Sequence, residues 1–164
     1  MARIAVLTVS DRGAAGERED LGGPLIAELA AAAGHAVAAR AIVPDELEQI
    51  AGQLRAWADG GVADVVITTG GTGLTPRDVT PEATRSVAER EVPGIAVALV
   101  ANGLQYTPFA ALTRGVAVTR GRTLIVNLPG NPKAVREGME VLLPLLNHAA
   151  ELLAGPVEHG PGAG

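Results

Sequence analysis

The chain has 164 residues, a net charge of −5 and 48% hydrophobic residues, enough for one domain with a sizeable core. The acidic balance and the three aromatic residues exclude the basic surface and the stacking platform of nucleic-acid-binding proteins. Without cysteine there is no disulfide, thiolate metal site or cysteine nucleophile. No apolar run suits a signal peptide or a membrane span, so we expect a cytoplasmic protein without nucleic-acid or membrane partners.

Short β-branched runs alternate along the chain with segments of helical periodicity. Strands are predicted at 3–10, 36–43, 63–69, 116–120 and 123–128, and helices at 24–33, 46–58, 80–90 and 131–153. A bend is expected in the last helix near Pro144. This alternation predicts an α/β sandwich with a mainly parallel sheet. We expect one domain over residues 1–154 and a frayed Gly/Pro-rich tail at 155–164.

The segment at 92–112 has a different pattern, because it is apolar nearly all round. It also contains two of the three aromatic residues, Tyr106 and Phe109. Such a segment is either a deeply buried helix or a helix that faces another subunit. In a domain of this size the subunit interface is favoured.

Four loops follow predicted strands and carry polar or glycine-rich sequences. They are Ser-Asp at 10–11, Pro-Asp at 44–45, the glycine loop "GGTGLTPRDVTPE" at 70–82 and "LPGNPK" at 128–133. In an open α/β sheet, ligands bind beyond the carboxyl ends of the strands. The four loops are therefore expected to meet at one edge of the sheet and form a site there.

The glycine loop has the composition of an anion-binding turn. Gly70, Gly71 and Gly73 can present backbone N–H groups in a concave nest, and Thr72 and Thr75 add hydroxyl donors. The loop lacks the lysine and the spacing of a P-loop. An ordinary strand-to-helix turn is the alternative, but such a turn does not need three glycines and two hydroxyls.

A second anion site is predicted where "GNPK" begins a helix at Asn131, because the first N–H groups of a helix lack partners within it. Lys133 is the only lysine of the chain and lies in that first turn, where a cation opposes the helix dipole. A solvated lysine beside a turn explains the local pattern about as well. Its being the single lysine favours a functional role.

Carboxylates on the loops suggest a metal ion. Asp78 is not needed as a helix cap if Thr80 serves as one. A carboxylate beside an anion site would repel phosphates, but it is explained if it binds Mg²⁺ that also contacts the phosphate oxygens. Asp11 and Asp20 are further candidates. Asp45 is better explained locally, as the cap of the next helix within a capping box. Two anion sites with loop carboxylates indicate phosphoryl or nucleotidyl transfer.

The segments "TTGGTGLTPRDVTPEAT", "LTVSDR", "IVPDE" and "NLPGNPKAV" together resemble the MogA/MoaB family of molybdenum cofactor biosynthesis. This family includes the bacterial molybdopterin adenylyltransferases and the G domain of gephyrin, and the resemblance spans residues 3 to 153. It implies a three-layer α/β/α domain, usually a trimer, that transfers AMP from ATP to the terminal phosphate of molybdopterin with Mg²⁺ and releases pyrophosphate. The product then passes to a separate molybdenum-inserting protein.

The resemblance also implies roles for individual residues. It makes Asp45 and Asp78 the catalytic and Mg²⁺-binding carboxylates, which overrides the assignment of Asp45 as a cap. Thr113-Arg114 stands where relatives commonly have Ser-Arg. The expected substrate- and nucleotide-binding residues are Ser10, Asp11, Asp20, Gly70, Gly71, Thr72, Gly73, Thr75, Thr113, Arg114, Asn127, Pro129, Gly130, Asn131 and Lys133.

Two alternatives have the same fold. One is a paralogue that binds molybdopterin or a similar pterin without transfer, and the presence of both Asp45 and Asp78 favours the enzyme over it. The other is a nucleotide-processing domain related to the competence-damage proteins. The short chain without a second domain counts against this alternative.

Overall fold

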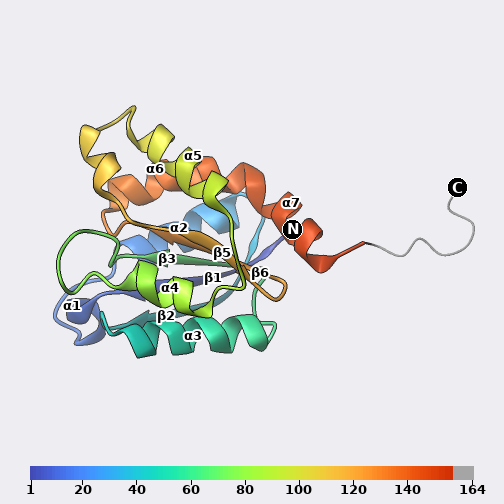
Figure 1. Cartoon of the computed structure of the whole chain (residues 1–164), viewed down its shortest axis with the longest axis horizontal. Helices are drawn as coiled ribbons and strands as arrows, with labels where there is room; N and C mark the ends of the chain where they lie inside the picture. Colours follow the sequence, from blue (N-terminus) through green and yellow to red (C-terminus); the bar gives the residue numbers. More distant parts are fainter. Residues whose placement is uncertain (157–164) are drawn as a thin grey trace, which may run out of the picture.

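The centre of the protein is a six-stranded sheet with the order β2-β1-β3-β6-β5-β4, seen in a computed structural model that describes residues 1–156 (Figure 1). Four neighbouring strands are parallel: β2 (Ala36–Val43), β1 (Arg3–Val9), β3 (Val65–Thr69) and β6 (Thr123–Leu128). The antiparallel strands β5 (Ala117–Arg120) and β4 (Arg90–Glu91) complete one edge. The mainly parallel sheet is confirmed, and only the two-residue β4 was not predicted.

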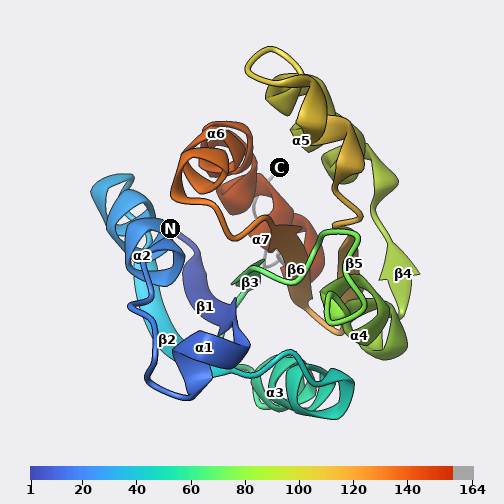
Figure 2. The same ribbon diagram turned by 90° about the vertical axis from the view of Figure 1, so that its left-hand side faces the viewer.

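Helices cover both faces of this sheet. The α-helices are α1 (Asp11–Ala14), α2 (Gly22–Ala32), α3 (Leu47–Asp59), α4 (Thr80–Val87), α5 (Pro93–Gly103), α6 (Pro132–Leu142) and α7 (Leu146–Ala154). Short 3-10 helices are η1 (Pro108–Leu112) and η2 (Leu143–Leu145), and η2 is the bend predicted near Pro144. Helices α3 and α4 lie on one face, while α2, α6 and α7 lie on the other and α5 packs beside α6 (Figure 2). The three-layer α/β/α architecture is thus confirmed.

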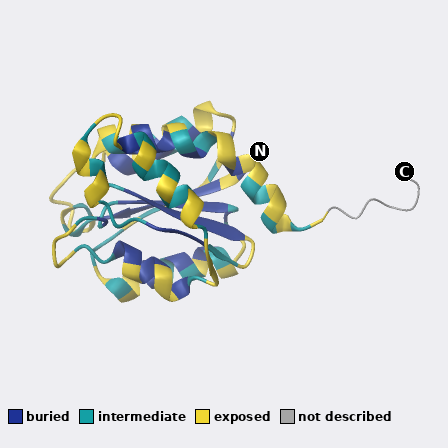
Figure 3. Cartoon of the chain, turned by 45° about the horizontal axis from the view of Figure 1, so that its top comes forward, coloured by how far each residue is buried: buried dark blue, intermediate teal, exposed yellow. Residues whose placement is uncertain are grey.

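The central strands are largely apolar because helices pack against both faces of the sheet. Along β1, Ile4 and Val6 pack among α2, α6 and α7, whereas Ala5 and Leu7 pack against α3 and its neighbours. Alternate side chains of a strand point to opposite faces, so a strand covered on both sides has to be apolar throughout. Figure 3 shows the resulting pattern of buried strands between helices whose outer faces are exposed.

The chain leaves neighbouring strands in opposite directions, and this creates the space for a site. From β1 the chain continues to α2 on one face, and from β3 it continues to α4 on the other. From β6 it returns to the first face with α6. Ligands bind in the crevices left where connections diverge at the carboxyl ends of strands. The glycine loop after β3 therefore has a crevice on each side.

The segment at 92–112 lies at the outside of the fold, beside α6. Of the two alternatives for this segment, the deeply buried helix is wrong. Gly103 is the only buried residue of α5, and Val97 and Phe109 are 67% and 73% exposed. The interface proposed for this segment stays a prediction. Of the predicted tail, residues 157–164 lie outside the described part of the chain. None of the helices within residues 1–156 is long and apolar enough to cross a membrane.

Ile67 offers a test of this packing, because it lies in the middle of β3 and is fully buried among α2, α6 and β6 residues. We expect Ile67→Ala to lower the free energy of unfolding by about 2–5 kcal/mol, the cost of a cavity in a packed core. Ile42→Ala is the control, since Ile42 is 42% exposed on the edge strand β2 and should cost about 1 kcal/mol or less. Urea unfolding followed by circular dichroism measures both; equal losses would contradict the assignment of the core.

Candidate functional site

A polar cavity of about 490 Å³ lies where the connections of β1 and β3 diverge. Its walls come from the ends of these strands, the loop between α1 and α2, the loop before α3 and the first turn of α6. The predicted site residues that it brings together are Ser10, Asp20, Asp45, Gly70, Gly71, Asp78, Gly130 and Asn131. Four segments far apart in the sequence thus meet at one edge of the sheet, as predicted.

The glycine loop takes a conformation that side chains would prevent. Gly70 and Gly71 have φ values of 99° and 71°, in the left-handed region. A Cβ on Gly70 would overlap the Val9 carbonyl oxygen, and one on Gly71 would overlap Thr80 Oγ1 and come within 3.2 Å of Asp45 Oδ1. The backbone of the loop therefore lies directly against the strand end, the next helix and a carboxylate.

Thr80 holds this loop in place and is not the helix cap that the sequence suggested. Its hydroxyl donates to the Gly70 carbonyl at 2.9 Å, and its N–H donates to the Gly71 carbonyl at 3.1 Å. Helix α4 begins at Thr80 after Val79, without a side-chain cap. The pattern of a threonine before a proline is typical of a cap, but here the hydroxyl bonds across the loop instead.

Asp45 is held by the loop after β1 and does not cap α3. Its Oδ2 accepts from the Asp11 N–H, and its own N–H donates to Asp11 Oδ1, both at 2.9 Å. The capping residue of α3 is Glu46, which makes no side-chain cap bond, so the capping-box prediction is wrong. Burial raises the pKa of Asp45, and the nearby carboxylates of Asp11 and Asp78 raise it further.

Arg77 ties three loops together from outside the cavity. Its guanidinium bonds both carboxylate oxygens of Asp11 at 2.9 and 3.0 Å, and Glu46 at 2.9 Å. This bond to Arg77 holds the pKa of Asp11 below its ordinary value. Asp11 does not line the cavity; its geometry positions Asp45.

Asp78 closes the other end of the glycine loop. Its Oδ2 accepts from the N–H and the hydroxyl of Thr75, at 3.0 and 2.8 Å, and a Cβ on Gly73 would come within 2.9 Å of the same oxygen. No hydrogen bond occupies Asp78 Oδ1 within residues 1–156, and Asp78 lines the polar cavity. The Thr75 hydroxyl is thus bonded to Asp78 and lines neither cavity.

Asp20 lines the same cavity from the loop between α1 and α2. Its carboxylate accepts from the Thr8 hydroxyl at 2.8 Å and from the Gly23 N–H at 3.0 Å, near the start of α2. Ser10 lies nearby and caps α1, accepting from the Gly13 N–H at 3.0 Å. Both predicted residues reach the cavity, but each has a hydrogen-bonding role of its own.

The "LPGNPK" segment packs tightly against the glycine loop. The Thr69 hydroxyl donates to the Pro129 carbonyl at 2.8 Å, and a Cβ on Gly130 would come within 3.4 Å of Gly70 Cα. Asn131 caps α6, as predicted, and accepts from the Lys133 N–H at 2.8 Å. The first turn of α6 thus faces the polar cavity, whereas Lys133 is exposed and lines neither cavity.

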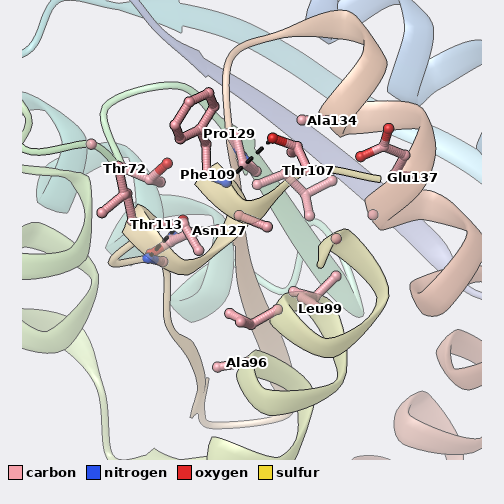
Figure 4. A pocket seen from close by; sticks show the side chains of 18 residues that line it. Thr72, Ala96, Leu99, Thr107, Phe109, Thr113, Asn127, Pro129, Ala134 and Glu137 are labelled. Carbon is pink, nitrogen blue, oxygen red and sulfur yellow. Dashed lines mark hydrogen bonds between the residues drawn. The ribbon is translucent and has the colours of Figure 1, made fainter. Parts of the chain in front are cut away.

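An apolar cavity of about 300 Å³ lies on the other side of the same loop, between α5, η1, α6 and the end of β6 (Figure 4). From the predicted set it contains Thr72, Gly73, Thr113, Asn127 and Pro129. Sequence reasoning missed the rest of its lining, including Leu99, Phe109 and Glu137. The apolar segment at 92–112 was a signal for it, but this signal was assigned to a subunit contact.

Two predicted ligand residues have their polar groups bonded within the protein. Arg114 donates to the carbonyls of Gly73 and Asp78 at 2.8 and 2.7 Å, and it pairs with Glu82. Asn127 is 3% exposed. Its amide accepts from the Val116 N–H and donates to the hydroxyls of Thr68 and Thr84, at 3.0–3.1 Å. Both residues therefore support the wall between the cavities.

A glycine nest at diverging strand connections, with a helix N-terminus and carboxylates around it, is typical of α/β domains that bind phosphorylated ligands. The chain belongs to the family described as a probable molybdopterin binding domain, which matches residues 5–148. The family resemblance expected from the sequence is confirmed.

Individual relatives agree with this assignment. A molybdopterin adenylyltransferase of Helicobacter pylori J99 is 39% identical over 93% of this chain and 88% of its own length. The molybdenum cofactor synthesis protein cinnamon of Drosophila melanogaster is 41% identical over 94% of this chain, which spans only 26% of cinnamon. Among solved structures, the molybdopterin biosynthesis enzyme MoaB of Thermus thermophilus has 53% sequence identity to this chain. Its crystal structure superposes with a TM-score of 0.89 and covers 95% of this chain and 98% of its own.

Gly71→Ala tests whether the loop conformation is specific to the site. Gly61 is the matched control, because its φ of 63° is similar but a Cβ there would meet nothing within 4 Å. We expect Gly61→Ala to cost about 1–2 kcal/mol of unfolding free energy from backbone strain alone. Gly71→Ala should cost more by at least about 1 kcal/mol, because the new methyl also displaces Thr80 or Asp45. Equal costs in urea unfolding would contradict the close packing at Gly71.

Proposed function

We propose that this chain is a molybdopterin adenylyltransferase that transfers AMP from Mg²⁺-ATP to molybdopterin. The observation that carries the proposal is the arrangement of two cavities, one polar and one apolar, on the two sides of a single glycine loop. Such a loop can bring the phosphates of two substrates together. The names of the bacterial relatives support the choice of these substrates.

The proposed reaction needs no side-chain nucleophile. An oxygen of the terminal phosphate of molybdopterin attacks the α-phosphorus of ATP; a new P–O bond forms there, the bond to the β-phosphate bridging oxygen breaks, and pyrophosphate leaves. The main obstacle is the repulsion between two polyanions. The N–H groups of the glycine loop and of the first turn of α6 reduce it and fix the orientation, and positioning with charge stabilisation supplies most of the catalysis in such transfers.

The carboxylates in the polar cavity fit Mg²⁺. Asp45 and Asp78 each use Oδ2 in hydrogen bonds to the protein, while Oδ1 of each takes part in none within residues 1–156. Mg²⁺ is typically held by one or two carboxylates together with substrate phosphates and water. No cluster of three or more His, Cys, Asp or Glu residues suited to a metal occurs in the described part of the chain. Bound there, Mg²⁺ would neutralise phosphate charge.

The proposal extends to assembly and location. The side chains of Val97, Leu104, Phe109 and Leu112 are exposed along α5, η1 and the turn between them, which supports a homotrimer through this region. The reaction would take place in the cytoplasm. Its adenylylated product would pass to a separate molybdenum-insertion protein.

A non-catalytic paralogue that only binds molybdopterin is the second candidate. It is favoured by one observation: the apolar cavity could bind a pterin ring without any contribution from Asp45 or Asp78, neither of which lines it. The two candidates differ in whether ATP is consumed, with Mg²⁺ required for that reaction.

An adenylylation assay separates them. Purified protein with molybdopterin, ATP and Mg²⁺ should form adenylyl-molybdopterin and pyrophosphate. We expect Asp78→Asn to lower the rate at least about 100-fold while molybdopterin still binds, because a preorganised charge is lost at the reacting phosphates. Asp64→Asn is the matched control, since Asp64 pairs with Arg3 and lines neither cavity. A wild-type protein that binds molybdopterin but forms no product would favour the second candidate.

Asp45→Asn should separate activity from stability. Because the pKa of Asp45 is raised in the folded state, the folded protein holds this proton to a higher pH than the unfolded chain does. Wild-type stability therefore falls as the pH rises from 3.8 through this raised pKa, and the neutral variant escapes that loss. We expect Asp45→Asn to be inactive yet at least as stable as wild type at pH 7, with a smaller difference in its favour at pH 4. Thermal unfolding of the variant and of wild type at both pH values measures this. If the variant's stability relative to wild type were lower at pH 7 than at pH 4, the ionised Asp45 would not destabilise the folded protein.

A further inference from the structure

Glu137 places an unpaired carboxylate on the wall of the apolar cavity. It lies on α6, and only 9% of the residue is exposed. Its backbone carbonyl accepts from Asn102 Nδ2 at 2.9 Å, but no hydrogen bond or ion pair reaches its carboxylate from any residue between 1 and 156. Figure 4 shows the side chain reaching from α6 towards the side of the cavity where Thr107 lies.

The surroundings do not compensate this charge. Apolar side chains form most of the lining, among them Leu99, Phe109 and Leu112. On α6 the cations Lys133 and Arg136 are both exposed and bond no carboxylate oxygen of Glu137 within residues 1–156, and the carboxylate of Glu140 accepts from the Tyr106 hydroxyl at 3.0 Å. Both glutamates act on this hydroxyl, Glu140 first through its hydrogen bond, and raise the pKa of Tyr106. No side-chain oxygen in the described residues is fully buried without a partner, so the Glu137 carboxylate is open to the cavity that it lines and can accept hydrogen bonds from a ligand there.

We propose that Glu137 is the specificity determinant for the pterin ring of the substrate, which it binds by accepting hydrogen bonds from the 2-amino group and the adjacent ring N–H. This inference rests on the proposed function, since it takes molybdopterin as the ligand. The edge of a pterin offers two parallel donors, which match the two acceptor oxygens of a carboxylate. The corresponding edge of adenine offers one donor and one acceptor, and half of it would face the carboxylate with a lone pair. The chemistry therefore assigns the pterin, and not the adenine, to the apolar cavity.

The course of α6 supports this division between the cavities. Its start at Asn131 and Pro132 lines the polar cavity, whereas Ala134, Glu137 and Gly138 line the apolar one. A Cβ on Gly138 would come within 2.7 Å of the Leu128 side chain, so the helix lies close against the end of β6. One rigid helix thus contacts both the heterocycle and the phosphates.

The test uses 6-hydroxymethylpterin and 6-hydroxymethyllumazine, which lacks the 2-amino group and has a carbonyl in its place. Each is titrated into the full-length protein, and quenching of the ligand fluorescence gives the dissociation constant. Wild type should bind the pterin at least about tenfold more tightly than the lumazine. Glu137→Gln should weaken pterin binding by a similar factor and strengthen lumazine binding, because an amide presents one acceptor and one donor. Glu140→Gln is the matched control on the same helix and should retain the wild-type preference.

Three results would overturn the inference: no saturable pterin binding by wild type, equal binding of the two probes, or an unchanged preference in Glu137→Gln. Mg²⁺-ATP binding, measured by calorimetry, should be the same in Glu137→Gln and wild type, and this also shows that the variant is folded. The inference and the proposed function fail separately. Selective pterin binding without adenylylation would contradict only the proposed function. Adenylylation together with an unchanged ligand preference in Glu137→Gln would contradict only the role of Glu137.

Discussion

The contact between the glycine loop and the first residue of α4 is the constraint on which the rest of the site depends. The Thr80 hydroxyl and N–H bond the Gly70 and Gly71 carbonyls, and no side chain fits between the loop and its neighbours. With the loop fixed in this way, the crevices on its two sides stay separate. One is lined by carboxylates and the first turn of α6, and the other is apolar and lined by a single carboxylate, that of Glu137. A rigid partition of this kind suits a reaction whose main requirement is the alignment of two charged substrates.

Charge is arranged around this partition at some cost to stability. Arg77 neutralises Asp11 and Glu46 outside the cavity, whereas Asp45 inside it faces further carboxylates, and burial raises its pKa. Arg18 is the one cationic side chain among the residues that line this cavity, against the carboxylates of Glu19, Asp20, Asp45 and Asp78. Carboxylates gathered at a ligand site are typical of places where the ligand brings further positive charge. The proposed role of Glu137 in the apolar cavity is similar, except that the ligand would supply N–H donors to the carboxylate instead of a metal ion. In both cavities the protein leaves acceptors that its own residues do not satisfy.

Much of the fold was predictable because parallel strands covered on both sides must be apolar throughout, as "VVITT" at 65–69 is. The meeting of the four loops followed from the same topology. The errors at Asp45 and Thr80 have one cause: both residues match local capping patterns, but their actual partners are 34 and 10 residues away, at Asp11 and Gly70. Glu137 gave no signal, since a glutamate in an amphipathic helix ordinarily lies in water and only the packing of α5 against α6 encloses it.

The central claim is that the glycine loop separates the two substrates, with the nucleotide phosphates and metal in the polar cavity. The most direct measurement is a crystal structure of the protein with a non-hydrolysable ATP analogue and Mn²⁺, whose anomalous signal locates the metal independently of the nucleotide. The claim predicts the metal beside Asp45 and Asp78 and the triphosphate against Gly70, Gly71 and the first turn of α6, with the apolar cavity free of adenine. Adenine in the apolar cavity against Glu137, or a metal away from both aspartates, would contradict it.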